Sequence, residues 1–485
     1  MVQSHNNTGP RGLRLTLKPN TLYLFVALIV VSLLIILSSL SLLPPHNEYP
    51  DSHPLSSALQ PVGDSAGENA SDRNYHMVFS TACSPFQNWQ AYMFFYHAWK
   101  VGQRGTVTRL ASGCKPDQRE EQQKVFDEMI APLSSQFHIH FTPDFSGPDK
   151  VKYFNKPFGL LHWMKESLGY PKKAHLYETD IIMILDPDMM LLKPLTHVFS
   201  SDQVHWHTPP VDNVTTVREG YPFAQLYGFA NQWLTSLGSN VSFVVGKDSP
   251  VHGVSYDDAA MYYPAGPPYL ATAGDMYRIA TSWTEFLPRV HQVFPEFMAE
   301  MHAYSTAAAH LKLPHLLARS FMVSDVGTRK LEGWGFLDDV SRQDACGSTA
   351  ETLPKAPFVF HYCQRYAVGK WFVGKYKLRE DFFTCEAPLL REPPRDVAAR
   401  YNWWIFPNEH EMVNYTKTPS REQEIVQHGW AMCKLIASLN EVATYYKEKH
   451  CDQNSHPNLN KVEIFHKKNK FEEFLEHGSF HGYGN

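Results

Sequence analysis

An uncharged run of 23 residues, Thr21–Leu43, separates a short N-terminal tail from the rest of the chain. As a helix this run would rise about 34 Å, which is enough to cross a hydrocarbon core of about 30 Å. Arg11, Arg14 and Lys18 precede the run. Because basic residues mark the cytosolic side of a membrane span, the pattern predicts a cytosolic tail at residues 1–20 and a lumenal remainder.

A cleaved signal peptide is the alternative interpretation of the same run. Its apolar core would be about 7–15 residues long and would end at an A-x-A site, and this sequence has neither. We therefore expect an uncleaved anchor in the lipid bilayer at residues 21–43. Residues 44–73 are rich in Pro, Ser, Asp and Gly, which predicts a stem that holds a folded domain away from the membrane.

The 485-residue chain is 43% hydrophobic and 19% charged, which is enough apolar material for a globular core. Its net charge is −5, whereas nucleic-acid-binding proteins usually carry an excess of basic residues, so we expect no nucleic-acid partner. Seven cysteines follow the apolar run, so three disulfides would leave one thiol free. Four N-x-S/T sequons also follow it, at Asn69, Asn213, Asn240 and Asn414. Both features suit a domain of the secretory pathway.

Strand and helix patterns alternate along the chain and predict an α/β fold. Apolar runs predict strands at 76–81, 106–111, 180–185 and 358–362. Helical patterns occur at 89–99, 155–168 and 422–447. In the second of these helices, Asn155 is suited to cap the N-terminus and Pro157 to occupy the first turn.

Asp186 and Asp188 stand on either side of Pro187, directly after the third predicted strand. In open α/β sheets, ligands bind at the carboxyl ends of strands. Pro187 fixes its own φ and favours an extended Asp186, which stiffens the turn. Two carboxylates placed in this way suit a hard divalent cation that also bridges a diphosphate. The alternative is a loop in which both Asp side chains only cap the next turn.

Three other residues are candidates, and each has a structural alternative. His361 ends the last predicted strand and is either a third metal ligand or a packed core histidine. Lys156 opens a helix, where anions are favoured, and is either a phosphate contact or a solvated lysine. Glu300 shares a helix face with Tyr304 and is either a site carboxylate or part of an amphipathic surface helix, which is the more common case for such a pair.

Taken together, these segments resemble the plant and algal family of hydroxyproline O-arabinosyltransferases and peptidyl-serine α-galactosyltransferases. The likeness covers roughly residues 75–380. The segments that carry it are FSTAC at 79–83, NWQ at 88–90, TRL at 108–110, NKPFG at 155–159, HW at 162–163, ILDPDM at 184–189, EMHAY at 300–304 and HY at 361–362.

The resemblance implies a GT-A-like mixed sheet flanked by helices at residues 74–380, a C-terminal extension at 381–485, and a Golgi or ER location. It implies Mn²⁺ or Mg²⁺ held by Asp186, Asp188 and His361. The donor would be a UDP-sugar, and Lys156 would assist at its diphosphate. The residues that the resemblance places near the nucleotide are Thr81, Ala82, Cys83, Arg109 and Ser112. The acceptor would be a serine or hydroxyproline hydroxyl of a secreted or cell-wall glycoprotein, and the sugar galactose or arabinose.

The products of the family imply retention of the anomeric configuration, which needs either a nucleophile on the far face of the sugar or front-side attack. Four carboxylates are candidates for this step: Glu300, Asp275, Asp257 and Asp258. The segment at 266–275 differs from both branches of the family. The identities of sugar and acceptor therefore stay open.

Other classes of protein fit parts of the pattern. A glycoside hydrolase would need two carboxyl groups about 5–9.5 Å apart and no metal. A phosphotransferase of the haloacid dehalogenase type would have Thr or Val at the position of Met190. A non-catalytic, membrane-anchored glycan-binding relative of the same fold would have no need of Asp186, Asp188 and His361. We expect a glycosyltransferase, and metal-dependent turnover separates it from these classes.

Overall fold

The computed structural model describes residues 73–147, 151–210, 214–328, 331–347, 355–405, 412–414, 422–452 and 456–462. The anchor predicted at Thr21–Leu43 lies outside these residues. Among the helices that the structure does describe, none combines the length and the apolar character needed to cross a bilayer. The domain boundaries predicted at residues 73 and 380 stay predictions.

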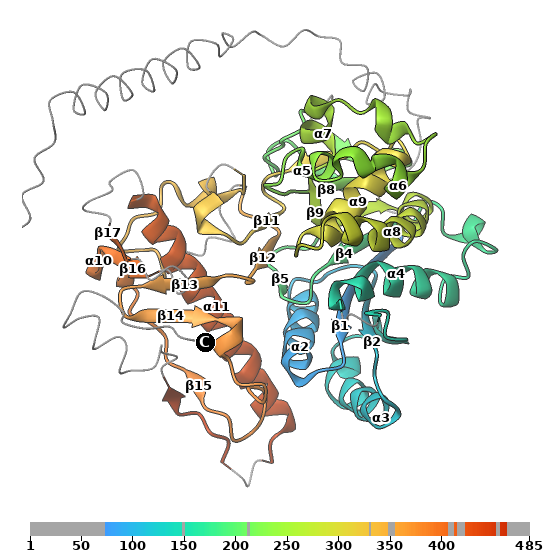
Figure 1. Cartoon of the computed structure of the whole chain (residues 1–485). Coiled ribbons are helices and arrows are strands. Elements are labelled where there is room, and N and C mark those ends of the chain that lie inside the picture. Colours follow the sequence, from blue (N-terminus) through green and yellow to red (C-terminus); the bar gives the residue numbers. More distant parts are fainter. Residues whose placement is uncertain are drawn as a thin grey trace, which may run out of the picture. The chain divides into compact units, whose positions relative to one another are not determined.

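A seven-stranded mixed sheet forms the centre of the fold (Figure 1). Its strands are β1 (Tyr75–Ala82), β2 (Thr106–Ser112), β3 (Phe137–Thr142), β4 (Ile181–Leu185), β8 (Phe223–Leu226), β9 (Ala265–Thr272) and β10 (Leu316–Ala318). Their order across the sheet is β10-β8-β9-β4-β1-β2-β3. β1 to β4 run parallel, whereas β9 is antiparallel to both β4 and β8. The sheet confirms the predicted α/β class.

Helices cover both faces of this sheet. Those that pack on its strands are α2 (Pro85–Lys100), α4 (Asn155–Glu166), α8 (Ala273–Val293) and α9 (Ala299–His310). The other helices of this part of the chain are α3 (Pro116–Val125), α5 (Gln232–Thr235), α6 (Val241–Val245) and α7 (Tyr256–Tyr262). In β1, Phe79 stacks on Phe94 of α2, whereas the ring of His76 meets Trp163 of α4. Because successive side chains of a strand point to opposite faces, α2 and α4 lie on opposite sides of the sheet.

Local sequence explains why β4 and α9 lie deep in the fold. All five residues of β4 are buried, as its unbroken apolar run predicts. In α9, eleven consecutive residues from Ala299 to Ala309 are buried, and many of them are alanines. Because this run leaves no face of α9 to solvent, α9 is an interior helix, and it packs against both α8 and β9. The alternative of an amphipathic surface helix at this position is therefore wrong.

The start of α4 differs from the prediction. A short turn of 3₁₀ helix, Lys152–Phe154, runs directly into α4, and Asn155 has helical backbone angles. The side-chain oxygen of Asn155 accepts a hydrogen bond from the backbone N–H of Phe145, 2.7 Å away. Asn155 therefore holds a neighbouring loop instead of capping its own helix. Pro157 does lie in the first turn, as predicted.

A second, three-stranded sheet brings a late part of the chain to the end of β4. Its strands are β5 (Met189–Leu191), β11 (Met322–Val323) and β12 (Val359–His361), in the order β11-β12-β5. β12 is antiparallel to β5, and His361 pairs with Met189. The residue next to Asp188 therefore lies opposite His361.

The remaining described elements lie mostly in the C-terminal third. They are β6 (Val198–Ser200), β7 (Val214–Thr216), β13 (Arg365–Val368), β14 (Trp371–Gly374), β15 (Leu389–Leu390), α10 (Val397–Arg400), β16 (Trp403–Ile405), β17 (Met412–Asn414), α11 (Glu422–His450) and β18 (Lys461–Val462). The long helix α11 packs against β13, β14, β15 and α2, so it contacts both the hairpin of β13 and β14 and a helix from the N-terminal part of the domain.

Three disulfides and one free thiol account for the seven cysteines. The pairs are Cys83–Cys114, Cys346–Cys433 and Cys385–Cys451. Cys363 is free. The first pair joins the ends of the neighbouring strands β1 and β2, and the other two tie α11 to earlier segments. This agrees with the expected count, although the sequence did not predict the partners.

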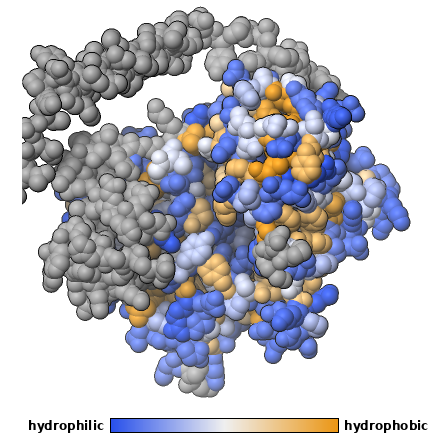
Figure 2. Space-filling model, in the orientation of Figure 1, coloured by the Kyte–Doolittle hydropathy of each residue, from blue (hydrophilic) through white to orange (hydrophobic). Residues whose placement is uncertain are grey.

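Large hydrophobic side chains are exposed at a few positions outside this core. Phe243 in α6 and Tyr256 in α7 are among them, with 50% and 63% of their surface accessible. Figure 2 shows hydrophobic residues gathered on the same side of the molecule, over the region of α5 to α7.

Candidate active site

The turn after β4 has a defined geometry. The backbone N–H of Met189 donates to the carbonyl of Asp186 at 3.1 Å, which closes the turn around Pro187. The N–H of Tyr362 donates to the carbonyl of Asp188, also at 3.1 Å. The short pairing of β5 with β12 thus fixes the backbone of Asp188 through residues that are distant from it in the sequence.

Asp186, Asp188 and His361 form one cluster. Each offers a ligand atom, and these atoms all lie within 4.8 Å of one another. Asp188 and His361 are buried, and Asp186 is partly exposed. In the part of the chain that the structure describes, this is the one group of three or more such residues. Two carboxylates and an imidazole are a suitable donor set for Mn²⁺, so the residues present fit the metal implied by the resemblance.

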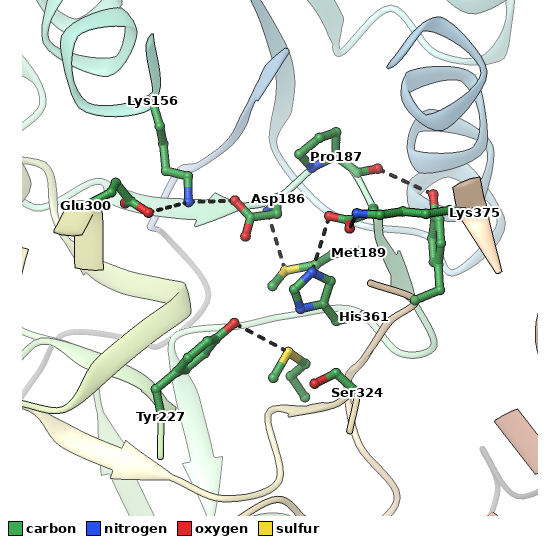
Figure 3. Close-up of polar contacts among 12 residues, drawn as sticks. Lys156, Asp186, Pro187, Met189, Tyr227, Glu300, Ser324, His361 and Lys375 are labelled. Carbon is green, nitrogen blue, oxygen red and sulfur yellow. Dashed lines mark hydrogen bonds and ion pairs between the residues drawn. The ribbon is translucent and has the colours of Figure 1, made fainter. Parts of the chain in front are cut away.

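Asp188 lies between the side chains of His361 and Lys375, both of which are labelled in Figure 3. Nε2 of His361 is 3.2 Å from Oδ1 of Asp188, and the ammonium of Lys375 pairs with Oδ2. Burial alone would raise the pKa of Asp188, but His361 and Lys375 hold it well below its usual range. Burial would likewise lower the pKa of His361, but Cys363 and Asp188 raise it well above 6.5. Without metal, positive charges on protein side chains therefore neutralise this carboxylate.

A second ion-pair group adjoins the first through Asp186. Nζ of Lys156 lies 2.7 Å from Oδ1 of Asp186 and 3.1 Å from Oε2 of Glu300. Burial alone would lower the pKa of Lys156, but the two carboxylates raise it above its ordinary value. Lys156 is therefore charged, and it joins the first turn of α4 to the first turn of α9.

Glu300 is the most deeply placed carboxylate of this second group, with 5% of its surface accessible. Its Oε1 atom is buried and has no hydrogen-bond partner among the described residues. Burial raises the pKa of Glu300, although Lys156 partly opposes the shift. A buried carboxylate with one unpaired oxygen beside a candidate metal ligand is well placed for chemistry.

The residues expected near the nucleotide lie at the same edge of the sheet as Asp186. Thr81 and Ala82 end β1, and Ser112 ends β2. The guanidinium of Arg109 is buried and donates to Thr81 Oγ1 at 2.8 Å, Asn88 Oδ1 at 2.9 Å and Gln122 Oε1 at 3.1 Å. Burial lowers its pKa to about 10. Arg109 thus joins the ends of β1 and β2 to α2 and α3.

Asp275 is not brought to this cluster. Thr272, at the end of β9, pairs with Ile181 at the start of β4, so Asp275 lies at the opposite edge of the sheet from Asp186. Its carboxylate accepts a 2.7 Å hydrogen bond from the N–H of Gly220 and pairs with Arg278. Asp257 and Asp258 occupy the first turn of α7, where Ser255 is the N-cap. Among the four carboxylates proposed from the sequence, Glu300 is the one in contact with the Asp186 group.

Lys375 and Tyr227 are site residues that the sequence did not reveal. Lys375 follows β14, in a segment without a recognisable motif. Tyr227 follows β8, and its hydroxyl points toward the cluster (Figure 3). No motif next to either residue in the sequence indicates a role at the site. Their positions depend on the pairing of the strands that precede them.

Comparison with known proteins places part of the chain in a family. Residues 75–208 match the N-terminal domain of the hydroxyproline O-arabinosyltransferase family. This part of the chain is thus similar to a domain of a glycosyltransferase family. The matched stretch includes Lys156, Asp186 and Asp188, whereas Tyr227, Glu300 and the residues after them lie outside it.

Two curated relatives extend the match beyond that domain. A peptidyl serine alpha-galactosyltransferase of Arabidopsis thaliana is 25% identical over 343 residues, which cover 69% of this chain and 35% of that protein. The chain thus spans about a third of its length. The hydroxyproline O-arabinosyltransferase PLENTY of Lotus japonicus is 20% identical over 352 residues, which cover 68% of this chain and 76% of that protein. The chain is a distant homologue of both, which confirms the resemblance.

Among solved structures, a galactosyltransferase, LgtC, in complex with donor and acceptor sugar analogues is similar to this chain. The identity is 13%, and the match covers 59% of this chain and 87% of the other. The TM-score is 0.33, which is too low to transfer the position of any residue.

Proposed function

We propose that this protein is a metal-dependent glycosyltransferase that moves a sugar from a UDP-sugar to a serine or hydroxyproline hydroxyl of a protein. The names of its two distant relatives support a peptide acceptor and either galactose or arabinose as the sugar. The observation that carries the proposal is the cluster of Asp186, Asp188 and His361, whose ligand atoms meet within 4.8 Å at the end of β4. We assign the domain to the GT-A type, with this cluster at its donor site.

Asp186, Asp188 and His361 would hold Mn²⁺ or Mg²⁺, which neutralises the charge that builds up on a leaving diphosphate. The chain adds two ammonium groups, Lys156 and Lys375, each paired with one oxygen of an Asp side chain. These lysines keep the buried carboxylates compensated before substrate binds. When a diphosphate enters, the same ammonium groups are within reach of its oxygens.

We assign the carboxylate step of a retaining reaction to Glu300. Its unpaired Oε1 is buried next to Asp186, and Lys156 holds the other oxygen, so the carboxylate has a fixed orientation. In this role it would attack the anomeric carbon while the bond to UDP breaks, or would stabilise the positive charge that develops there during front-side attack. Asp275 lies at the other edge of the sheet and has no such position.

The anchor and the compartment belong to the same proposal. We propose a single-pass type II protein of the Golgi or ER, with its catalytic domain in the lumen. The uncharged run at Thr21–Leu43 and the basic residues before it support this topology. The three disulfides support a lumenal domain, because such bonds persist in oxidising compartments.

The test is UDP release by the full-length protein in detergent, with Mn²⁺ and peptides that contain serine or hydroxyproline. UDP-galactose and UDP-arabinofuranose are the donors. Asp188→Asn is nearly isosteric but removes a charged ligand, so turnover should fall by about two orders of magnitude or more. Asp257→Asn is the matched control, because Asp257 is exposed in α7. Full turnover in excess EDTA, or in Asp188→Asn, contradicts the metal mechanism.

The same assay separates the other two classes. A glycoside hydrolase would release free sugar without metal. A glycan-binding relative would release UDP with neither donor.

A further inference from the structure

Tyr227 is held at the site by strand pairing. It directly follows β8, and its backbone N–H donates to the carbonyl of Pro264 at 2.8 Å, just before β9 begins. The pairing of β8 with β9 is irregular at this point, with a register shift between Ala224 and Gln225. The hydrogen bond fixes the backbone of Tyr227. Because β9 is antiparallel to both β8 and β4, the end of β8 lies at the same edge of the sheet as the end of β4.

Gly266 makes room for the Tyr227 ring. A Cβ atom at Gly266 would lie 2.0 Å from Cδ2 and 2.1 Å from Cε2 of Tyr227, which is far inside van der Waals contact. The ring therefore lies directly against the backbone of β9 at Gly266. Any larger residue at position 266 must displace the ring. Gly266 opens the segment of the sequence that departs from both branches of the related family.

The hydroxyl of Tyr227 has little to bind within the protein. Among the described residues its one hydrogen bond is to Sδ of Met322, at 3.9 Å, which is a weak contact. Burial raises the pKa of Tyr227 well above 10, and Asp186 and Cys363 add to the shift. The hydroxyl therefore keeps its proton at physiological pH. Figure 3 shows it directed toward Asp186 and His361.

The order of the strands indicates which part of a substrate would meet this hydroxyl. β1 and β2 lie on one side of β4, and β9 and β8 lie on the other. Arg109 and the residues proposed for the nucleotide are on the β1–β2 side. The Asp186 cluster, proposed for the diphosphate, is at the end of β4. A donor that runs across this edge places its sugar on the β9–β8 side, where Tyr227 and Glu300 lie.

We propose that the hydroxyl of Tyr227 donates a hydrogen bond to a hydroxyl of the transferred sugar, and that Gly266 is the residue that permits this contact. The inference rests on the proposed function and adds a specificity-determining residue to it. A site that hydrogen-bonds a substrate hydroxyl discriminates strongly against an analogue that lacks it, because the protein group is then left unpaired.

The test measures binding by calorimetry, without acceptor, to the full-length protein with Mn²⁺. The probes are UDP and whichever of UDP-galactose and UDP-arabinofuranose the wild type turns over. In Tyr227→Phe, the affinity for the UDP-sugar should fall about 5- to 30-fold, and the affinity for UDP should stay unchanged. Tyr277→Phe is the matched control, because Tyr277 is also partly exposed and packs on another ring, that of Tyr170, near the opposite edge of the sheet.

A second arm uses Gly266→Ala and donors that each lack one sugar hydroxyl. Gly266→Ala should lower the affinity for the UDP-sugar as Tyr227→Phe does, because the added methyl group displaces the ring of Tyr227. One deoxy donor should bind wild type and Tyr227→Phe with equal affinity. The inference is overturned if Tyr227→Phe loses affinity for UDP and UDP-sugar equally, or loses affinity for neither. It is also overturned if no deoxy donor binds wild type and Tyr227→Phe with equal affinity. If the wild type turns over neither donor, the proposed function fails and the inference falls with it.

Discussion

The ammonium group of Lys375 forms an ion pair with the carboxylate of Asp188, although the two residues are 187 positions apart in the sequence. His361 contacts the other oxygen of the same carboxylate. A candidate metal ligand is thus shared by an imidazole and an ammonium before any cation binds. Both partners come from the chain that follows β11, so the late segments of the protein complete the site that β4 begins.

Removal of Lys375 should strengthen metal binding. In Lys375→Met, no ammonium competes for Asp188, so the affinity for Mn²⁺ alone should rise about 3- to 10-fold. Lys377→Met is the matched control, because Lys377 is exposed in the same short helix. Calorimetric titration of both variants with Mn²⁺ checks this expectation. Weaker or unchanged binding in Lys375→Met would mean that the ion pair does not oppose the metal.

Metal affinity should rise with pH. The pKa of His361 is raised well above 6.5 in the metal-free protein, and a protonated imidazole cannot bind a cation. Below that pKa, protons compete with the metal, so the Kd for Mn²⁺ should increase about tenfold for each pH unit of acidification.

His361→Ala should bind Mn²⁺ more weakly than wild type at high pH and should show a flatter pH profile. His456→Ala, at an exposed histidine, should match wild type. Mn²⁺ titrations at pH 6, 7 and 8 measure both effects. If the His361→Ala curves superimpose on those of wild type, His361 is a packed histidine and not a ligand.

Replacement of Glu300 should lower kcat without a comparable loss of affinity for UDP. Glu300→Gln keeps the shape of the side chain but removes the charge at the unpaired oxygen, so kcat should fall about 100-fold or more. Binding of UDP should stay within about threefold of wild type. Glu296→Gln, just before α9 and exposed, is the control. A fall in UDP affinity as large as the fall in kcat would indicate that Glu300 only positions Lys156 and Asp186.

Stability should fall between pH 4.5 and pH 7 because of Glu332. Burial raises the pKa of Glu332 from 4.5 to about 7, against hydrogen bonds from Ser324 and Asp325 that lower it. The folded protein therefore holds this proton more tightly than the unfolded chain. The contribution is fully present below pH 4.5 and is lost as the pH rises through 7, with a total of about 3 kcal/mol.

Urea unfolding at pH 4.5 and pH 7.5 measures this contribution to the free energy of unfolding. Glu332→Gln cannot ionise, so the difference between variant and wild type should change by about 3 kcal/mol across the same range. A constant difference would show that Glu332 is ionised throughout.

Asn240 should carry an N-linked glycan if the chain has the proposed topology. Asn240 is exposed, and Ser242 completes its sequon at the start of α6. Glycosidase treatment of the full-length protein from eukaryotic cells should therefore shift its gel band. Asn240→Gln and Ser242→Ala should each remove one increment of that shift. Loss of no increment in both variants would contradict glycosylation at this position.

The sequence alone predicted the elements whose patterns are local. The unbroken apolar run of β4 gave a buried strand, because a strand covered on both faces needs apolar side chains at every position. The Asp-Pro-Asp turn after it placed two carboxylates at a strand end, where α/β folds bind ligands. The order of short motifs was enough to predict the family resemblance that the comparisons confirm.

Contacts between distant segments were decided by the tertiary structure. The antiparallel pairing of β12 with β5 sets His361 opposite Met189, and the hairpin that follows carries Lys375 to Asp188. No periodicity in the sequence encodes such a pairing, because strand register depends on how two faces pack together.

The same limit explains Asn155 and Tyr227. Asn155 has the side chain of a helix cap, but the loop that contains Phe145 lies within hydrogen-bond distance and takes that oxygen instead. Tyr227 is a site residue because Gly266, on the neighbouring strand, leaves space for its ring. Local sequence determined which backbone conformation each segment prefers. Close packing between segments determined which side chains meet at the site.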